Sequence, residues 1–494
     1  MAFVLLPAPI ERFRRLVVLL LFSGLTAFAQ KPNFVLVVGD DHDLSALGCY
    51  GNPQVRTPHL DQLAREGVRF TRAYASTASC SPSRSTLLAG RHNHNTGQYG
   101  LAHATHHFRS HEELKTLPAL LHAAGYTTAR VGKYHVAPES AYPFDVALGE
   151  NGSNPVDMAN RSAAFLEKQK NAPFFLYFCP TDPHRAGTFP GLPFNANPHG
   201  NRPGGHEGVT ETPYGMDSLR VPFFLPDAPE TKAELAQYYQ SVSRMDQGIG
   251  RLFQILKEKG LWENTIVIYL SDNGMPVPGA KTTHYEPGVR LPLIVRNPFS
   301  AQKGAVCDEL VCWVDVAPTL LDYAGLNPPT LARSAPPTGG GEYGERGPTP
   351  FFHGTSWKPF FDDPARFKAD TVFLSHTFHE VTMYYPMRTV VTKRYKLIHN
   401  LAHGLPFPFA ADLWNSATWQ GFVKSGKAQY GPRTRQAYER RPEYELYDLE
   451  NDPQERQNLA SSKTHQPVFN ALLLSLKQFQ ERTNDPWRVK WTHE

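Results

Sequence analysis

The sequence predicts an α/β fold: a large mixed, mostly parallel sheet sandwiched by helices, then a smaller C-terminal α+β domain built on an antiparallel sheet. Apolar runs bounded by turn residues indicate strands buried on both faces, and helical stretches alternate with them. The expected strands of the large sheet are Asn33–Val38, Thr127–Val131, Pro173–Phe178 and Thr265–Leu270. The expected helices are Pro58–Gly67, Leu114–Ala124, Lys232–Lys259 and Val311–Tyr323.

The hydrophobic period changes in the last third of the chain, after a Pro- and Gly-rich stretch at 326–350 that reads as a linker or loop. Expected there are the strands Thr371–Ser375, Met387–Thr392, Tyr395–Asn400 and Tyr444–Leu449, and a closing helix Pro467–Arg482. Because 494 residues exceed what one core usually supports, we expect a catalytic domain over 30–365 and a C-terminal domain over 366–494.

The N-terminus has the pattern of a signal peptide over residues 1–29. Three arginines precede the apolar run 16–22, and Ala27-Phe28-Ala29 fits the small-residue cleavage rule. The run is too short to span a bilayer permanently. We therefore expect a secreted or periplasmic protein without a membrane anchor.

Composition and charge fit a globular enzyme. Charged residues make up 19% of the chain and the net charge is +4, which suits an anionic substrate and does not indicate nucleic-acid binding. The cysteine count is odd, so at least one cysteine is unpaired or chemically altered. The five are Cys49, Cys80, Cys179, Cys307 and Cys312. Cys179 lies in an apolar run and is expected in the core.

Polar residues follow the expected strands of the large sheet where each strand ends. In open α/β sheets, ligands bind beyond the carboxyl ends of the strands, so these residues should converge. Acidic and amide groups occur in two pairs, Asp40-Asp41 and Asp272-Asn273. Oxygen ligands alone suit a hard cation, Ca²⁺ or Mg²⁺, better than zinc.

A set of cations and histidines is expected around the same point: Arg84, Lys133, His135, His184 and Lys281. Such groups can hold the oxygens of a tetrahedral anion and move protons. Cys80 stands at an expected helix start, where backbone N–H groups favour an anion. The pattern indicates phosphoryl or sulfuryl transfer with Cys80 as the candidate nucleophile.

The motifs that carry these residues resemble those of the sulfatase family, of alkaline-phosphatase-like fold. Cys80-Ser-Pro-Ser-Arg84 is similar to the family signature, and further blocks follow in family order: Gly132–His135, Asp182–His184, Ser271–Gly274, Lys281–Glu286 and Glu445–Pro453. Other stretches resemble the heparan N-sulfatases (sulfamidases), among them 98–108, 136–145, 379–388 and Asn484–Trp487. Lys281 departs from the arginine of that subfamily.

The resemblance implies an activity: hydrolysis of the N-sulfate of glucosamine residues in heparan sulfate or heparin fragments. Cys80 would be oxidised to formylglycine by a formylglycine-generating enzyme, and one Ca²⁺ per chain would bind Asp40, Asp41, Asp272, Asn273 and residue 80. A hydroxyl of the aldehyde hydrate would attack sulfur. The resemblance also implies a homodimer.

The other roles follow the same resemblance. Arg84 would support the hydrate, and Lys133 and Lys281 would hold sulfate oxygens. His184 would protonate the leaving nitrogen, and His135 would take a proton from the second hydroxyl to expel sulfate. The candidate sugar-binding residues are Tyr99, His106, His107, His284, His379 and Glu380; ordinary packing or solvent exposure is the alternative for each.

Other classes of function stay open. One is an exo-acting O-sulfatase on another glycosaminoglycan or sulfated sugar. Another is a phosphoesterase of the same fold, against which the cysteine motif argues. A glycan-binding protein would result if Cys80 stayed a thiol. The basic stretch Arg433–Arg441 could track a polyanion or lie solvated, and Asp246 is expected to be a solvated or helix-capping acid.

Overall fold

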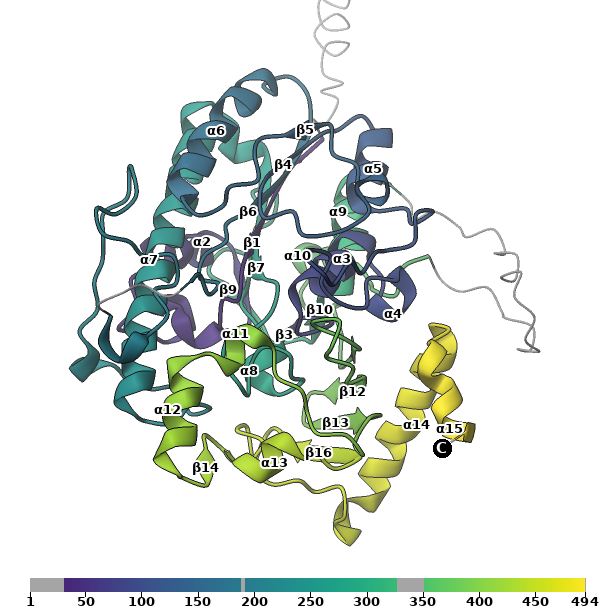
Figure 1. The fold of residues 1–494 in the computed structure, drawn as a ribbon. Helices are drawn as coiled ribbons and strands as arrows, with labels where there is room; N and C mark the ends of the chain where they lie inside the picture. The colour runs from purple at the N-terminus through teal and green to yellow at the C-terminus, as the bar shows by residue number, and fades with distance from the viewer. Residues whose placement is uncertain (1–30, 188–191, 327–350, 494) are drawn as a thin grey trace, which may run out of the picture.

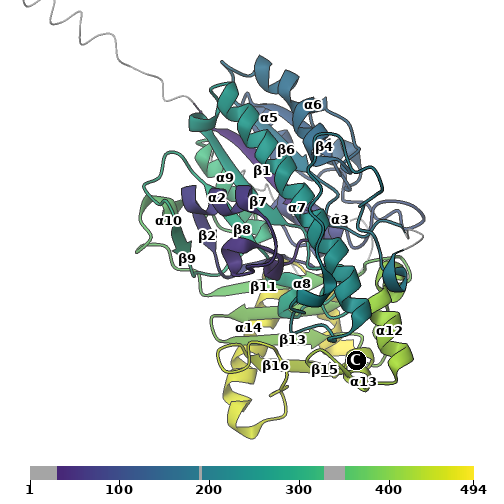
Figure 2. The ribbon, with the colours of Figure 1, turned by 90° about the vertical axis from the view of Figure 1, so that its left-hand side faces the viewer.

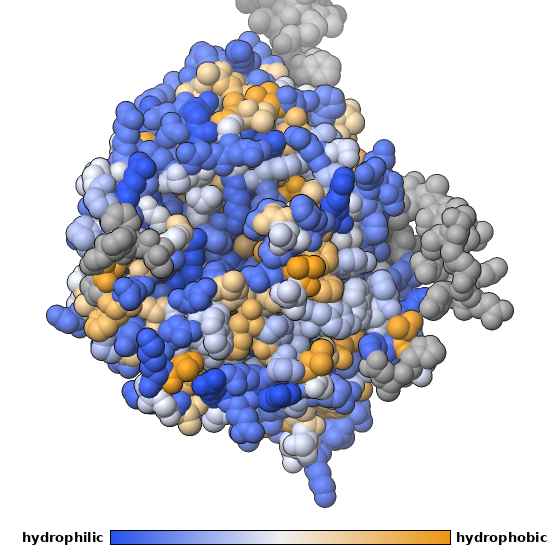
Figure 3. All heavy atoms as spheres, viewed as in Figure 1, coloured by the Kyte–Doolittle hydropathy of each residue, from blue (hydrophilic) through white to orange (hydrophobic). Residues whose placement is uncertain are grey.

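The computed structural model describes residues 31–187, 192–326 and 351–493 (Figure 1). The expected signal peptide and most of the expected linker lie outside the described residues. Within the described ranges, no helix is long and apolar enough to cross a membrane. On the face that Figure 3 shows, hydrophilic residues predominate and apolar ones form small, separate groups.

A mixed eight-stranded sheet forms the centre of the larger part of the molecule, as predicted. In spatial order it contains β5 (Val146–Ala147), β4 (Thr127–Gly132), β6 (Phe174–Cys179), β1 (Asn33–Gly39), β7 (Thr265–Ser271), β8 (Leu293–Arg296), β2 (Val68–Phe70) and β9 (Ala305–Cys307). The four predicted strands β4, β6, β1 and β7 are neighbours and run parallel. β8 is antiparallel to both of its neighbours.

Side chains of β1 alternate between two cores, which explains its continuous apolar run. Phe34 and Leu36 pack with the core on one face of the sheet, and Val35 and Val37 with the core on the other. Successive side chains of a strand point to opposite faces. A strand with a helical layer on each side is therefore apolar at every position.

Helices cover both faces of this sheet (Figures 1 and 2). One face carries α2 (Pro58–Glu66), α6 (Pro155–Lys168) and α7 (Pro229–Glu258). The other carries α3 (Cys80–Ala89), α5 (Leu117–Ala123), α9 (Val316–Tyr323) and α10 (Lys358–Asp362). α6 was not predicted; its apolar positions are separated by polar ones.

A four-stranded antiparallel sheet forms the C-terminal part, as predicted. Its order is β11 (Thr371–His376), β12 (Met387–Thr392), β13 (Tyr395–Asn400) and β16 (Tyr444–Asp448). The expected hairpin joins β12 to β13, and α14 (Gln466–Arg482) packs on the sheet through Leu476 and Phe479. The domain boundary between 365 and 366 stays a prediction.

The remaining elements are short. They are β3 (Ala73–Tyr74), β10 (Val311–Cys312), β14 (Gln429–Tyr430), β15 (Arg433–Thr434), α4 (Asn93–Thr96), α8 (Glu286–Val289), α11 (Ala411–Trp414), α12 (Ala417–Ser425), α13 (Arg435–Glu439) and α15 (Lys490–His493).

The helix predicted over Val311–Tyr323 is wrong in its first part. Val311 and Cys312 form β10, which pairs in parallel with β3, and α9 starts only at Val316. The Asp315 carboxylate accepts the N–H of Cys312 at 2.7 Å, so the chain turns before the helix begins. Sheet pairing with a distant segment outweighs the local pattern here.

Two arginines of the basic stretch Arg433–Arg441 pack against aromatic rings, whereas Arg440 is exposed, so the expected solvated surface holds for part of the stretch only. The guanidinium of Arg433 lies 3.3 Å from the ring centre of Tyr285, and that of Arg441 lies 3.4 Å from the ring centre of Phe407. Only 3% of Arg441 is exposed. Both arginines therefore cover aromatic rings within the C-terminal part.

Asp246 on α7 caps a different helix. It is fully buried, so the prediction of a solvated acid is wrong. Its carboxylate accepts the N–H groups of His59 (3.1 Å) and Leu60 (2.8 Å) in the first turn of α2. These are two of the N–H groups that a helix start leaves without a partner. The cap thus connects two helices on one face of the sheet.

Asp246 should make stability depend on pH. Burial raises the pKa of this carboxyl from 3.8 to about 7, so between these values the native state binds more protons than the unfolded chain. The contribution to the free energy of unfolding therefore falls as pH rises through this window. Asp246→Asn keeps one acceptor and cannot ionise. The stability of wild type relative to this variant, followed by Tm, should fall from pH 5 to 7, by at most about 1.4 kcal/mol per unit. A difference in stability between the two proteins that does not change with pH would contradict this prediction.

Candidate active site

The carboxyl ends of the parallel strands converge as predicted. Asp40 and Asp41 follow β1, Lys133 follows β4, His184 follows β6, and Asp272 and Asn273 follow β7. The backbone ties these ends together: the N–H of Asp40 donates to the carbonyl of Asp182 at 3.1 Å, and that of Asp41 to Asp272 Oδ1 at 3.1 Å. Parallel neighbours thus bring residues more than 200 positions apart to one point.

Cys80 is the first residue of α3, at the same point. All ten residues of this helix are buried, which is unusual for so polar a segment. The Cys80 Sγ lies 3.8 Å from Asp41 Oδ1, and the thiol is 1% exposed. Burial raises its pKa well above the ordinary value. The unmodified thiol is therefore a poor source of thiolate.

Three cations each lie against one of the three carboxylates. Lys133 Nζ is 2.7 Å from Asp40, Lys281 Nζ is 3.0 Å from Asp41, and an Arg84 guanidinium nitrogen is 2.8 Å from Asp272. All of these acids are at most 1% exposed.

The pKa shifts of these groups follow from burial and pairing. Burial alone would raise the pKa of Asp40, but Lys133, His184 and Arg84 together outweigh it, so the pKa lies below its usual value. For Asp272 burial outweighs Arg84, and the pKa is raised. Burial would lower the pKa of Lys281, but the acidic groups around it, Asp41 first, together raise it well above the ordinary range. Both lysines are charged at neutral pH.

The donor set fits a hard divalent cation. Ligand atoms of Asp40, Asp41, Cys80 and His184 all lie within 4.8 Å of one another. Asn273 Oδ1 is buried and has no hydrogen-bond partner among the described residues. A buried acceptor left without a donor is costly unless something else binds it. Carboxylate and amide oxygens are the ligands that calcium and magnesium prefer.

The backbone at this point is strained in three non-glycine residues. Asp41, His135 and Thr282 have φ of 64°, 58° and 68°. Such conformations persist only where the surrounding structure enforces them, and they cluster at functional sites. Each stands next to, or is itself, one of the predicted site residues.

The two histidines predicted to transfer protons differ in environment. His184 Nδ1 lies 2.6 Å from the carbonyl oxygen of Arg185, so it donates there, and Nε2 lies 3.4 Å from Lys281 Nζ. His135 contacts His103 through Nε2, and its buried Nδ1 has no partner among the described residues. Burial lowers the pKa of His135 well below its usual value.

A cavity of about 750 Å³ opens onto these groups. Asp40, Cys80, Lys133, His184 and Lys281 contribute to its lining. Three predicted sugar-binding residues, His106, His379 and Glu380, also line it. His379 belongs to the C-terminal part, and its Nδ1 lies 2.8 Å from the hydroxyl of Ser79, beside Cys80. The cavity is therefore built by both parts of the chain.

Three other predicted sugar-binding residues are not in the lining of this cavity. Tyr99 packs edge-on against Trp487. His107 is exposed and lies outside it. His284 is fully buried, with Nδ1 2.7 Å from the Thr389 hydroxyl, so it faces neither substrate nor solvent. These three residues therefore do not line the cavity, and for Tyr99 and His107 a contact with the sugar stays a prediction.

Among the acidic, basic and histidine side chains of the lining, four were missed: His103, Glu150, Arg185 and Asp412. His103 stands three residues before His106, and Arg185 follows His184, so proximity to a motif could have indicated both. Asp412 lies in the four-residue helix α11, far from any recognised block. Nothing in its local sequence marks it.

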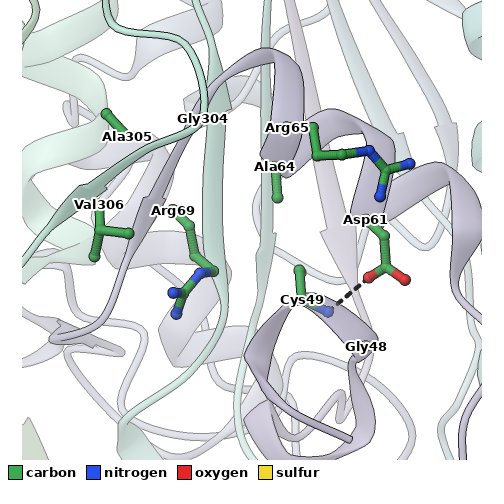
Figure 4. Close-up of a pocket in the computed structure, with 9 residues that line it drawn as sticks. All are labelled: Gly48, Cys49, Asp61, Ala64, Arg65, Arg69, Gly304, Ala305 and Val306. Carbon is green, nitrogen blue, oxygen red and sulfur yellow. Dashed lines mark hydrogen bonds between the residues drawn. The ribbon is translucent and has the colours of Figure 1, made fainter. Parts of the chain in front are cut away.

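A second hollow of about 330 Å³ lies beside β2 and β9 (Figure 4). Its lining includes Cys49, Asp61, Arg65 and Arg69, and Asp61 accepts the N–H of Cys49 at 2.7 Å. None of the predicted site residues lines it.

All five cysteines are free, and Cys179 is buried in the core as predicted.

This chain is similar in sequence and in fold to known proteins. Residues 32–326 match the family described as Sulfatase. Human N-sulphoglucosamine sulphohydrolase is 37% identical over 484 residues, covering 95% of this chain and 93% of its own. N-acetylglucosamine-6-O-sulfatase of Bacteroides thetaiotaomicron is 25% identical over 531 residues, covering 87% and 89%. A structure solved with its substrate D-glucosamine-2-N,6-O-disulfate aligns at a TM-score of 0.63 and 23% identity, covering 92% and 99%.

Fold and site define the class: an alkaline-phosphatase-like fold, with acidic groups close enough to share a cation and a ring of basic groups at the carboxyl edge of a mixed sheet. Within that class the chain belongs to the sulfatase family, which hydrolyses sulfate esters and sulfamates.

Calcium should stabilise the protein through these ligands. At a calcium concentration about 100 times its Kd, the gain is about 2.7 kcal/mol, seen as a rise in Tm of metal-stripped protein. Asn273→Ala should reduce this rise because it removes the unpaired Oδ1. Asn470→Ala, an exposed position on α14, is the control and should keep it. Equal rises in both variants would remove Asn273 from the cation site.

Proposed function

We propose that this protein is an exported, formylglycine-dependent sulfatase that hydrolyses the N-sulfate of glucosamine residues in heparin or heparan sulfate fragments. One observation carries the proposal: three buried carboxylates, each with a cation, cluster beside Cys80 at the head of a buried helix, and Asp40, Cys80 and the two lysines line one cavity. The 37% identity to a human N-sulphoglucosamine sulphohydrolase along nearly the whole chain supports the N-sulfate as substrate.

Two groups would supply part of the chemistry. Residue 80, oxidised to formylglycine by a formylglycine-generating enzyme, would supply a hydrated aldehyde as nucleophile, and one Ca²⁺ held by Asp40, Asp41, Asp272, Asn273 and residue 80 would supply positive charge next to the sulfate. The fit of these oxygens and the unpaired Asn273 Oδ1 support calcium.

The lysines bind the sulfate. Lys133 and Lys281 reach the cavity with charged Nζ atoms from opposite sides of the carboxylate cluster. In so buried a site their attraction for sulfate oxygens is strong, and it needs no reorganisation as the reaction proceeds. Arg84, fully buried against Asp272, orients the start of α3 and thus residue 80.

The histidines move protons. His184 Nδ1 is committed to the Arg185 carbonyl, so the proton exchanged with substrate is on Nε2, which faces Lys281 and the cavity. We assign to Nε2 the protonation of the leaving nitrogen, because an amide-type anion leaves poorly without an acid. His135 takes a proton from residue 80 when sulfate is released.

The second candidate is an exo-acting O-sulfatase. The 25% identity to N-acetylglucosamine-6-O-sulfatase favours it, since the same catalytic groups serve either linkage. The proposal also includes a homodimer, a cleaved signal peptide over 1–29 with secretion or export to a periplasm, and a catalytic domain over 30–365 followed by a C-terminal domain over 366–494.

Loss of one sulfate-binding lysine should slow the reaction without unfolding the protein. Lys133→Ala removes one preorganised charge and should lower kcat by about 10²- to 10³-fold. Lys170→Ala, an exposed lysine, is the control and should retain the wild-type rate. Wild-type kcat in Lys133→Ala would remove this residue from the sulfate site.

The choice between the two linkages is tested directly by substrate. Sulfate release is measured from glucosamine N-sulfate and from glucosamine 6-O-sulfate, each with calcium and with a chelator. We expect release from the N-sulfate, dependent on calcium. Release from the 6-O-sulfate alone would overturn the N-sulfatase proposal and favour the second candidate.

A further inference from the structure

A further carboxylate, Asp412, lies in the active-site cavity and has no part in the chemistry described above. It belongs to α11, and its side chain is 25% exposed. Its Oδ2 lies 3.2 Å from Lys281 Nζ, and its Oδ1 accepts the N–H of Leu413 at 2.9 Å. Lys281 and the other basic groups nearby together outweigh the effect of burial and hold the pKa of Asp412 below its ordinary value, so the group is charged.

A charged carboxylate is out of place in a site that binds an anion. Asp40, Asp41 and Asp272 are explained by the cation that they would share, but Asp412 is not one of these ligands. Its negative charge beside Lys281 works against sulfate binding. A donor or cationic group on the substrate itself would account for such an arrangement in a substrate site.

Asp412 lies on the same side of the site as the proposed acid. Lys281 Nζ is 3.2 Å from Asp412 Oδ2 and 3.4 Å from His184 Nε2, so the two groups flank one ammonium. The leaving group must pass close to His184 Nε2 to receive its proton. Asp412 therefore lies close both to the atom that leaves and to the sulfate oxygens that Lys281 would hold.

The neighbourhood of Asp412 is otherwise polar and open to the cavity. Ligand atoms of His379, Glu380 and Asp412 lie within 4.8 Å of one another. His379 is 3% exposed, lines the cavity, and uses Nδ1 on Ser79. Three side chains that can bind polar groups therefore line the cavity close to one another.

We propose that Asp412 selects a sulfamate over a sulfate ester by accepting a hydrogen bond from the leaving nitrogen. This rests on the proposed N-sulfatase function. A sulfamate nitrogen carries a hydrogen, whereas the bridging oxygen of an ester carries only lone pairs, which the carboxylate repels. When the S–N bond breaks, the nitrogen keeps the bonding pair, takes the proton from His184 Nε2 and leaves as an amine. At neutral pH this amine takes up a further proton, and the resulting ammonium is stabilised by the negative charge of Asp412.

The test is the ratio of kcat/KM on glucosamine N-sulfate to that on 4-nitrophenyl sulfate. Asp412→Asn removes the charge, and its amide can donate to an ester oxygen, so the ratio should fall about 10- to 100-fold, the worth of a charged hydrogen bond. Asp217→Asn, at an exposed position outside the cavity, is the matched control and should leave the ratio unchanged. If Asp412 acts only by holding Lys281, both substrates lose equally, and an unchanged ratio overturns the proposal.

A measurement on wild type decides the matter if the variant does not fold. Glucosamine, which carries the product's ammonium, should inhibit competitively at a concentration at least tenfold below that of glucose. Equal inhibition by the two sugars would overturn the role of Asp412 while leaving the N-sulfatase proposal standing. Wild type that releases no sulfate from glucosamine N-sulfate would overturn both.

Discussion

The burial of three carboxylates at the carboxyl edge of the sheet is the constraint on which the site depends. Isolated buried charges are very costly, and each of these acids is paired with a buried or nearly buried cation. The pairs come from the ends of three strands, β1, β4 and β7, from α3 and from the loop before α8. This arrangement exists only because β4, β6, β1 and β7 are parallel neighbours.

The same constraint explains the polar, fully buried helix α3. Arg84 has to reach Asp272 from inside the helix, and Ser83 donates to the carbonyl of Asp272 at 2.5 Å. These contacts hold Cys80, the first residue of α3, beside Asp41. The C-terminal part completes the site through His379, which is bonded to Ser79, and through Asp412 on Lys281. The cavity is therefore lined by residues at the carboxyl edge of the large sheet and by residues of the C-terminal part.

The sequence predicted the parts of this structure whose signals are local. Strands buried on both faces, such as β1, are continuous apolar runs, and the residues that follow them carry the family motifs. The paired positions of Val311 and Cys312 could not be read in this way, because β10 exists through its partner β3. His284 has the residue type expected of a sugar contact, but its burial against Thr389 depends on how the two sheets pack. Asp412 could not be predicted from the sequence for the same reason, because only tertiary contact brings α11 to Lys281.

We infer that Cys80 is the precursor of an aldehyde in an active sulfatase. Mass spectrometry of the tryptic peptide Ala73–Arg84 tests this inference. The protein is taken from cells that contain a formylglycine-generating enzyme, and its sulfate release is measured on the same preparation. The account predicts an active preparation in which residue 80 has lost sulfur and two hydrogens and gained one oxygen. An equally active preparation in which the peptide is found entirely as the cysteine thiol would contradict it.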